Sequence, residues 1–341
     1  MRCAALALLP ALCGCYVVRQ AAGQLEILIG QEDAAPLVED DRLSGDEARK
    51  LLVIEEVREF AFTRVALTRN DNYTTFYDTR GRAVSYVVSA CRKDRFENYT
   101  WSFPIVGRFA YKGFFSRTDA QAEARELEAA GYDTTLREVA AYSTLGWFRD
   151  PVFSGMLRRT EADLVSLIIH ELTHGTVHAE GATDFNEEMA TFVGVRGAIQ
   201  FIEARYGAGS RELARALAQF HDDEIFDDFM RSLYDRLDAL YKDDELASAE
   251  KIARRAEVFA GARDEFRRLK PRFRTPGYFF FERLPLNNAE IVANKRYGGY
   301  VLYDRIWRRA NGSWVTFLQW MRIAAASPDP SKAIEALAAG R

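Results

Sequence analysis

Two histidines four residues apart, His170 and His174, enclose a glutamate in the segment HELTH. On an α-helix, residues i and i+4 lie on one face about one turn apart, so both imidazoles can face a single point. Glu171 lies about 100° around the helix from His170, where its carboxylate can reach a water molecule at that point. These residue types at this spacing are suited to holding a metal ion and activating water on it.

The pattern is HExxH, the arrangement found in zinc peptidases. Apolar residues recur at helical spacing around it (Leu164, Leu167, Ile168 and Leu172), which predicts a buried helix. Three of the chain's four histidines lie in or directly after this segment. Because buried imidazoles and carboxylates need partners, we interpret them as metal ligands rather than as solvated side chains.

A catalytic zinc takes three protein ligands and leaves a fourth position for water, so one ligand must lie elsewhere. His178 is a candidate because Gly175 could bend the chain, although a straight helix carries it roughly 6 Å beyond His174. The spacing differs from that of metzincins, whose third histidine lies six residues after the second. The other candidates are Glu187 and Glu188, in a second predicted helix that follows a turn at residues 181–184.

The second predicted helix presents Glu187 on a face of small residues, while Glu188 shares a face with bulkier ones. The small face continues with Ala190, Thr191, Gly194 and Gly197 or Ala198. Small residues allow this helix to approach the HELTH helix closely, as a shared metal requires. We therefore choose Glu187 as the third ligand, ahead of His178 and then Glu188. Asp184, Asn186 and Glu188 are expected to support the ligands or contact substrate, and Thr183 or Asp184 to cap the helix.

The elements that position these residues predict an α+β fold that is predominantly helical. Ser44 and Glu47 form a capping box that begins a helix reaching about residue 68. The remaining predictions are strands within 82–115, a helix over 119–130 ended by Gly131, a strand over 134–142 and helices from Glu161 onward. We expect a single unit over 44–341, with an N-terminal α/β part (44–157) and a helical catalytic part (158–341).

The N-terminus predicts a lipoprotein signal peptide over residues 1–14. One basic residue and a short apolar run lead to Leu12-Cys13-Gly14-Cys15, which resembles a bacterial lipobox. Cys15 would be lipidated and become the first residue of the mature chain, followed by a tether over 15–43. Since residue 16 is tyrosine rather than aspartate, the expected location is the cell envelope, at the outer membrane facing the periplasm. The mature chain would then keep Cys91 as its single unmodified cysteine, so no internal disulfide is expected.

The charge of the chain argues against a nucleic-acid partner. Its formal net charge is -4, whereas nucleic-acid-binding domains are usually strongly basic. A basic cluster within residues 263–274 is interspersed with acids, so we interpret it as a solvated helix face. Beyond the N-terminal anchor, no stretch is apolar enough to predict a second membrane segment.

Several sequence blocks together resemble the predicted zinc aminopeptidases among bacterial lipoproteins, a gluzincin-like group of HExxH metallopeptidases. The blocks are GQLEIL (23–28), FPIVGRFAYKGFF (103–115), AGYD (130–133), AYSTLGWFRDPVFSGML (141–157), FNEEMATFV (185–193) and LNNAEIVA (286–293). The resemblance runs from Cys15 to roughly Trp307. It implies a zincin-like fold, one zinc ion bound by His170, His174 and Glu187, and a catalytic Glu171.

The chain departs from this group at one pair of positions. Many members carry cysteines where this chain has Ser102 and Arg108. The resemblance therefore implies that a local disulfide is missing here, which concerns stability rather than metal chemistry.

The expected activity is hydrolysis of peptides by a membrane-anchored zinc enzyme. The residues themselves indicate a zinc hydrolase, and the resemblance adds the aminopeptidase activity. Tyr142, Tyr297 and Tyr300 are candidates for stabilising the oxyanion, and Asp184, Glu188, Asn287 and Asn288 for holding the free amine of a substrate. The alternatives are an endopeptidase, a cell-wall amidase or a non-catalytic lipoprotein scaffold.

Overall fold

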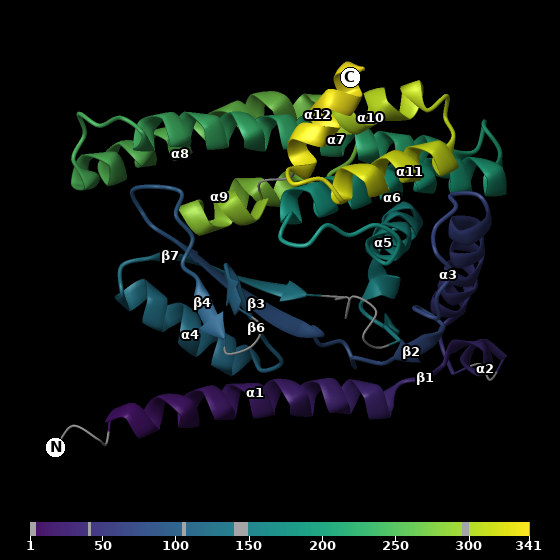
Figure 1. Cartoon of the computed structure of the whole chain (residues 1–341), viewed down its shortest axis with the longest axis horizontal. Helices are drawn as coiled ribbons and strands as arrows, with labels where there is room; N and C mark the ends of the chain where they lie inside the picture. Colours follow the sequence, from purple (N-terminus) through teal and green to yellow (C-terminus); the bar gives the residue numbers. More distant parts are fainter. Residues whose placement is uncertain (1–4, 40–41, 104–106, 140–148, 295–299, 341) are drawn as a thin grey trace.

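Helices make up most of the chain, and three small β-sheets lie in its N-terminal half (Figure 1). This computed structural model describes residues 5–39, 42–103, 107–139, 149–294 and 300–340. The predominantly helical α+β class predicted from the sequence is confirmed at this level. Among the described residues, no helix combines the length and the apolar character needed to cross a membrane.

The largest antiparallel sheet has β3 (Ser85–Cys91) between β6 (Tyr111–Phe114) and β7 (Asp133–Val139). Alternate residues of β3, including Val88 and Ala90, are buried in a cluster against α4 (Arg117–Ala129). Ser116 caps α4 by accepting a hydrogen bond from the Asp119 backbone N–H, and Gly131 follows with a φ of 89°. The strands and the helix with its terminal glycine are therefore confirmed, except for residues 104–106 and 140–142, which lie outside the described residues.

A two-stranded hairpin, β4 (Trp101–Phe103) and β5 (Gly107–Phe109), lies beside this sheet. Ser102 is directly opposite Arg108 in its register. Cross-strand neighbours of this kind have closely spaced Cβ atoms, so a pair of cysteines at these positions would be near each other. Cys91, in contrast, is a buried free thiol.

A second sheet brings together segments that are far apart in the sequence. β2 (Thr75–Tyr77) pairs antiparallel with β1 (Glu32–Asp33) and parallel with β8 (Val152–Phe153). A single 3₁₀ turn, Met156–Arg158, leads from β8 to the helix that carries HELTH. The sheet therefore fixes the start of that helix.

The N-terminal segment differs from the tether expected over residues 15–43. Ala5–Gly30 form α1, and Ala34–Glu39 form α2. Apolar side chains explain the difference: Ile27 and Leu37 are buried in the main core. The Tyr16 hydroxyl also donates a hydrogen bond of 2.8 Å to the backbone oxygen of Gly113 in β6. Thus α1, which continues through Cys15, lies along the sheet instead of leading away from it (Figure 1).

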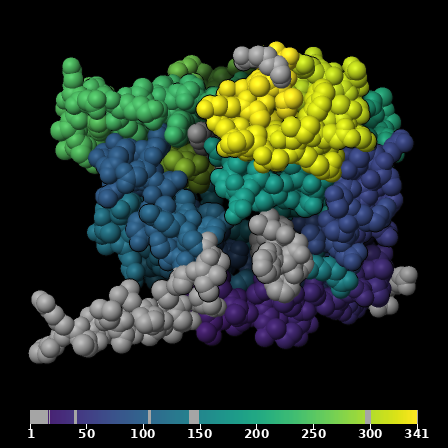
Figure 2. Space-filling model, in the orientation of Figure 1, coloured from purple at the N-terminus to yellow at the C-terminus, as the bar shows by residue number. Residues whose placement is uncertain are grey.

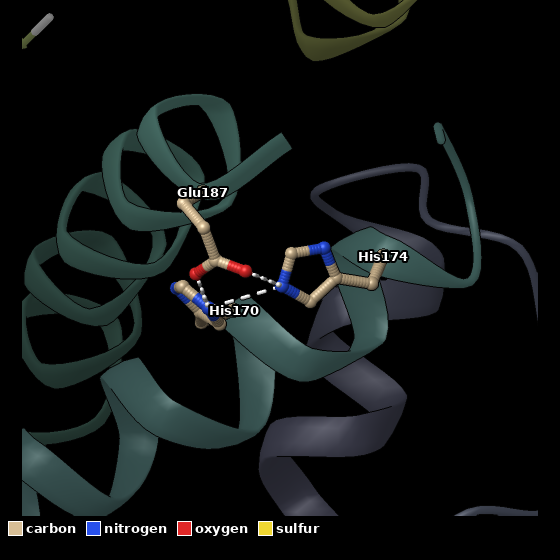
Figure 3. A group of neighbouring side chains, drawn as sticks. All are labelled: His170, His174 and Glu187. Atoms are coloured by element: carbon tan, nitrogen blue, oxygen red, sulfur yellow. Dashed lines mark hydrogen bonds and ion pairs between the residues drawn. The ribbon is translucent and has the colours of Figure 1, made fainter. Parts of the chain in front are cut away.

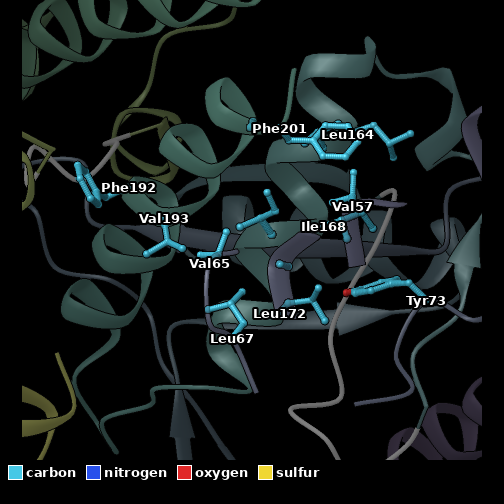
Figure 4. Close-up of a cluster of buried hydrophobic side chains, with 14 of the residues drawn as sticks. Val57, Val65, Leu67, Tyr73, Leu164, Ile168, Leu172, Phe192, Val193 and Phe201 are labelled. Atoms are coloured by element: carbon cyan, nitrogen blue, oxygen red, sulfur yellow. The ribbon is translucent and has the colours of Figure 1, made fainter. Parts of the chain in front are cut away.

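The main hydrophobic core joins α3 (Gly45–Thr63), from the N-terminal part of the chain, to α5 (Glu161–His174) and α6 (Thr183–Tyr206) (Figure 4). The capping box predicted at Ser44 and Glu47 is present at the start of α3, which ends five residues before the predicted limit. Val57 of α3 and Ile168 of α5 are fully buried together with residues of α6. The two parts expected on either side of residue 157 therefore share one core.

The remaining long helices fall into two groups: one packs over α6 as part of the main core, and the other has a hydrophobic core of its own. α10 (Tyr300–Arg309), α11 (Trp314–Ala325) and α12 (Pro330–Ala339) pack over α6 as the yellow region of Figure 2. α7 (Arg211–Tyr241) and α8 (Ser248–Leu269) form a long antiparallel pair with its own apolar core.

Buried polar bonds fasten this helical pair to the sheet. Asp133 of β7 accepts hydrogen bonds from Arg255 of α8, at 2.5 and 3.2 Å, and from the backbone of Asn288 at 2.8 Å. Asn288 begins the short helix α9 (Asn288–Asn294). Since all three side chains are largely withdrawn from solvent, their pairing avoids an uncompensated buried charge.

The closest helix contact in the centre of the molecule is between α5 and α6. A methyl group added at Gly194 would lie 2.7 Å from the backbone oxygen of Ser166 and 3.1 Å from the Cβ atom of His170. At Gly197 it would lie 3.0 Å from the side chain of Ile169. The small face predicted for the second helix is therefore the surface on which the two helices meet.

We expect Gly194→Ala to separate these helices, because its new methyl group meets backbone that cannot rotate away. The predicted loss of stability is about 1–3 kcal/mol in denaturant unfolding, accompanied by weaker metal binding. Gly261→Ala is the matched control, since Gly261 lies on an exposed part of α8 with open space around it. That change should stabilise the protein by up to about 1 kcal/mol. Equal stability of the two variants would show that the contact is not tight.

Candidate metal centre

Three side chains from α5 and α6 converge on one point (Figure 3). The Nε2 atoms of His170 and His174 lie 3.1 Å apart. The two carboxylate oxygens of Glu187 lie 3.4 Å from the Nε2 atom of His170 and 3.5 Å from that of His174. Glu187 thus projects from α6 between the two imidazoles of α5, as the small-face argument predicts.

The separations of these atoms fit a tetrahedral metal ion. With metal–ligand bonds of about 2.0–2.2 Å, neighbouring ligands of tetrahedral zinc lie about 3.3–3.6 Å apart. The two separations between Glu187 oxygens and imidazole nitrogens lie in this range, and the two Nε2 atoms, at 3.1 Å, are slightly closer. Two imidazole nitrogens and one carboxylate oxygen are also ligands that zinc accepts. Within the described parts of the chain, this is the one group of three such residues that could hold a metal.

The protonation states favour metal binding. Burial and the neighbouring His170 lower the pKa of His174 to about 4, so its imidazole is neutral at pH 7. Burial opposes ionisation of Glu187, but its hydrogen bond with His170 and the charges of both histidines lower its pKa overall. Neutral imidazoles and an ionised carboxylate are the forms that bind a metal.

Glu171 has a different environment from Glu187. Burial is the main cause that raises the pKa of its carboxyl, with a smaller contribution from the charge of Glu187, while the charge of His170 opposes the shift. A carboxylate whose affinity for protons is raised is suited to accept one from water. Its position next to His170 on α5 agrees with the role predicted from HExxH.

Tyr73 is a residue near Glu171 that the sequence analysis missed. It is buried, and burial followed by the charge of Glu171 raises the pKa of its hydroxyl. Figure 4 shows this hydroxyl directed towards Leu172 on α5. The backbone of Tyr73 has a φ of 64° and donates a hydrogen bond of 2.7 Å to the oxygen of Asp150. Left-handed backbone at a non-glycine residue is strained and often occurs at functional sites, but it leaves no pattern in the sequence.

Asn186 closes the turn between the two ligand-bearing helices. Its side-chain oxygen accepts a hydrogen bond from the Ala179 N–H, and its side-chain nitrogen donates one to the Ala179 carbonyl oxygen, each at 2.8 Å. The expected capping role of Thr183 or Asp184 is wrong, because α6 begins at Thr183 after Ala182 and no side chain caps it. Asn186 supplies the missing restraint from inside the helix and thereby sets the position of Glu187.

His178 is exposed on the chain between these helices and is not part of the converging group. α5 ends at His174, and the backbone then turns, with Val177 donating a hydrogen bond to the carbonyl of Thr173. His178 still lies close enough for its charge to lower the pKa of His174. The structure therefore favours Glu187 over His178 as the third ligand.

The other predicted site residues fall into separate places. Glu188 lines a hollow of about 420 Å³ together with His170 and Tyr300, while Asp184 is exposed at the start of α6. Tyr142 and Tyr297 lie outside the described residues. Tyr300 lines the same hollow as His170.

Asn287 and Asn288 have structural partners instead of the expected contact with substrate. The Asn287 side chain donates to the backbone oxygen of Thr134, at 3.0 Å. The buried Asn288 amide donates to the oxygen of Arg92 and accepts from the Tyr241 hydroxyl, both at 2.7 Å. Their role is to fix α9 against the sheet, which a sequence block alone does not reveal.

A family model described as "Putative aminopeptidase" matches residues 15–336, which is nearly the whole chain. Searches of the curated proteins and of the solved structures found no match.

We expect the purified full-length protein to bind one equivalent of zinc through these three residues. Substituting His170→Ala, His174→Ala or Glu187→Gln should weaken zinc binding by at least about 100-fold. Loss of a residue that only hydrogen-bonds to a ligand already weakens metal binding by up to about 100-fold, so loss of a ligand should cost at least as much. His178→Ala is the matched control and should bind zinc like the unmodified protein. Competition with a chromophoric chelator measures these affinities. If Glu187→Gln binds zinc with unchanged affinity and His178→Ala loses affinity, the third ligand is His178 and not Glu187.

Proposed function

The chain belongs to the "Putative aminopeptidase" family, and from this premise we propose that it is a zinc-dependent aminopeptidase. The observation that carries the proposal is the spacing of the three ligand atoms, with a half-buried Glu171 beside them. Three protein ligands leave one coordination position for the reaction, whereas a structural zinc site is usually closed by four. The proposal includes a zincin-like, gluzincin-type arrangement, in which a glutamate on a second helix completes HExxH.

The proposed chemistry divides between the metal and the protein. A bound zinc ion supplies Lewis-acid polarisation of a water molecule and of the scissile carbonyl. Glu171 takes the proton from the attacking water on its carboxylate and delivers it to the leaving amine. Its raised pKa supports both steps, because the group must hold the proton between them.

Two residues beside the site are suited to assist the reaction. Tyr300 lines the same hollow as His170, and burial raises the pKa of its hydroxyl, so it stays protonated and able to donate a hydrogen bond. Glu188 lines that hollow too and could receive the free amine of a substrate. We propose Tyr300 as the donor to the oxyanion and Glu188 as the group that recognises the amine.

We further propose that the mature protein is anchored to the cell envelope through lipidated Cys15. The apolar run before it and the Leu-Cys-Gly-Cys sequence support this, and the family match begins at residue 15. Cleavage there would keep the part of α1 that carries the contact between Tyr16 and Gly113. The anchor would hold the enzyme on the periplasmic face of the outer membrane.

Glu171→Gln tests the mechanism because it keeps the shape of the side chain but removes its basicity. We expect peptide turnover to fall by at least about 10²–10⁴-fold while the zinc content is unchanged. Glu180→Gln, an exposed change in the turn between α5 and α6, is the matched control and should retain full activity. The assay compares peptides with free and acetylated N-termini. Equal turnover of both would indicate an endopeptidase, and full activity in Glu171→Gln would refute the mechanism.

A further inference from the structure

Two hollows adjoin one another along helix α5. The first, of about 420 Å³, is the one lined by His170, and the second, of about 870 Å³, lies at the N-terminal end of α5. Three residues line both: Arg159, Asp163 and Asp223. Together the two hollows form one groove, which we call the α5–α7 groove, and it begins at His170.

The order of the lining residues gives the direction and length of this groove. On α5, residues between Asp163 and His170 line the first hollow, and residues from Glu161 to Asp163 line the second. The groove therefore runs from His170 towards the N-terminal end of α5. Helix rise is about 1.5 Å per residue, so His170 and Glu161 are about 14 Å apart along the axis. An extended peptide advances about 3.3 Å per residue, so the groove has room for about four residues beyond the metal.

Helix α7 forms the facing wall and follows the same course. Phe220 and Glu224 line the first hollow, whereas Glu212 and Gln219 line the second. The groove therefore lies between two helices along its whole length and does not close after the first hollow. A site for a single amino acid would need only the hollow beside His170.

Acidic side chains outnumber basic ones along the groove, and two guanidinium groups among them can bind a peptide backbone. Arg159 lies where the two hollows meet, and Arg215 lies in the far one. Neither guanidinium forms an ion pair or side-chain hydrogen bond with the residues that the structure describes. Arg159 is close enough to Glu171 for its charge to influence that carboxyl. Exposed guanidinium groups at these points can donate to peptide carbonyls or to a terminal carboxylate.

We propose that the α5–α7 groove, from His170 towards Glu161, binds about four residues of an extended peptide on the C-terminal side of the bond that is cut, while Glu188, next to Glu187, lies at the opposite end of the first hollow. This rests on the proposed function, because an aminopeptidase has a single substrate residue on the N-terminal side of that bond. A groove for about four residues on one side of the metal must then hold the other part of the substrate. The substrate class is therefore oligopeptides of about five residues or more rather than dipeptides.

The first experiment measures peptide length dependence in two ways with the full-length protein. Hydrolysis is followed for peptides of two to six residues that share the same N-terminal residue and carry a C-terminal amide. Binding of the same peptides to the Glu171→Gln protein is followed by calorimetry, which needs no turnover. We expect kcat/KM to rise by at least about tenfold from two to five residues, and Kd to fall in parallel, before both level off.

The second experiment obstructs the far hollow. Gly277 lines it, is exposed, and has ordinary space for a side chain, so Gly277→Trp should fold normally and fill the groove. The matched control is Gly261→Trp on the exposed surface of α8, which lines neither hollow. We expect the ratio of kcat/KM for the hexapeptide to that for the dipeptide to fall at least about fivefold in Gly277→Trp and to stay constant in Gly261→Trp.

The outcomes separate this proposal from the proposed function. Length-dependent binding without hydrolysis would support the groove and refute the aminopeptidase. Hydrolysis with kcat/KM and Kd independent of length, and equal ratios in the two tryptophan variants, would support the aminopeptidase and overturn the groove. If kcat/KM rises instead when residues are added on the N-terminal side of the cut bond, the assignment of the groove to the C-terminal side is overturned.

Discussion

The closeness of α5 and α6 is the constraint on which the metal centre depends. Ligand atoms about 3.4 Å apart on two different helices require backbones nearer than most side chains permit. Gly194 meets this requirement, because its missing side chain leaves room for the Ser166 oxygen and the His170 Cβ atom. Asn186 then fixes the rotation of α6 by bonding Ala179. Packing and hydrogen bonding thus set the ligand spacing before any metal arrives.

This prearrangement has an electrostatic cost that a metal ion would relieve. The ligand group gathers two imidazoles and a carboxylate in a place from which water is partly withdrawn, and its atoms are close enough to repel when equally charged. Burial, and then the neighbouring His170, lower the pKa of His174, so the site resists a positive charge on that imidazole. A divalent cation would satisfy all three groups at once. Because the side chains already lie close together, metal binding would require little reorganisation of the protein.

Sequence patterns predicted which side chains converge at the candidate metal centre, because each pattern rests on local geometry. HELTH on a helix places two imidazoles on one face, and the small residues after Glu187 predict the close helix contact that the structure contains. The capping box at Ser44 is also a local pattern. Features that depend on distant contacts escaped prediction. Ile27 and Leu37 turn an expected tether into packed helices, and Tyr73 reaches the site through the fold of a segment far before α5 in the sequence.

The turn held by Asn186 also bears on the order in which the site is assembled during folding. Both ligand-bearing helices and their connection lie within residues 161–206, so contacts that define the metal centre have small sequence separations. Such local contacts form early, whereas α3, which packs against this helix pair, lies far earlier in the sequence. The α5–α6 hairpin can consequently bring the three side chains of the candidate metal centre together before α3 packs against it.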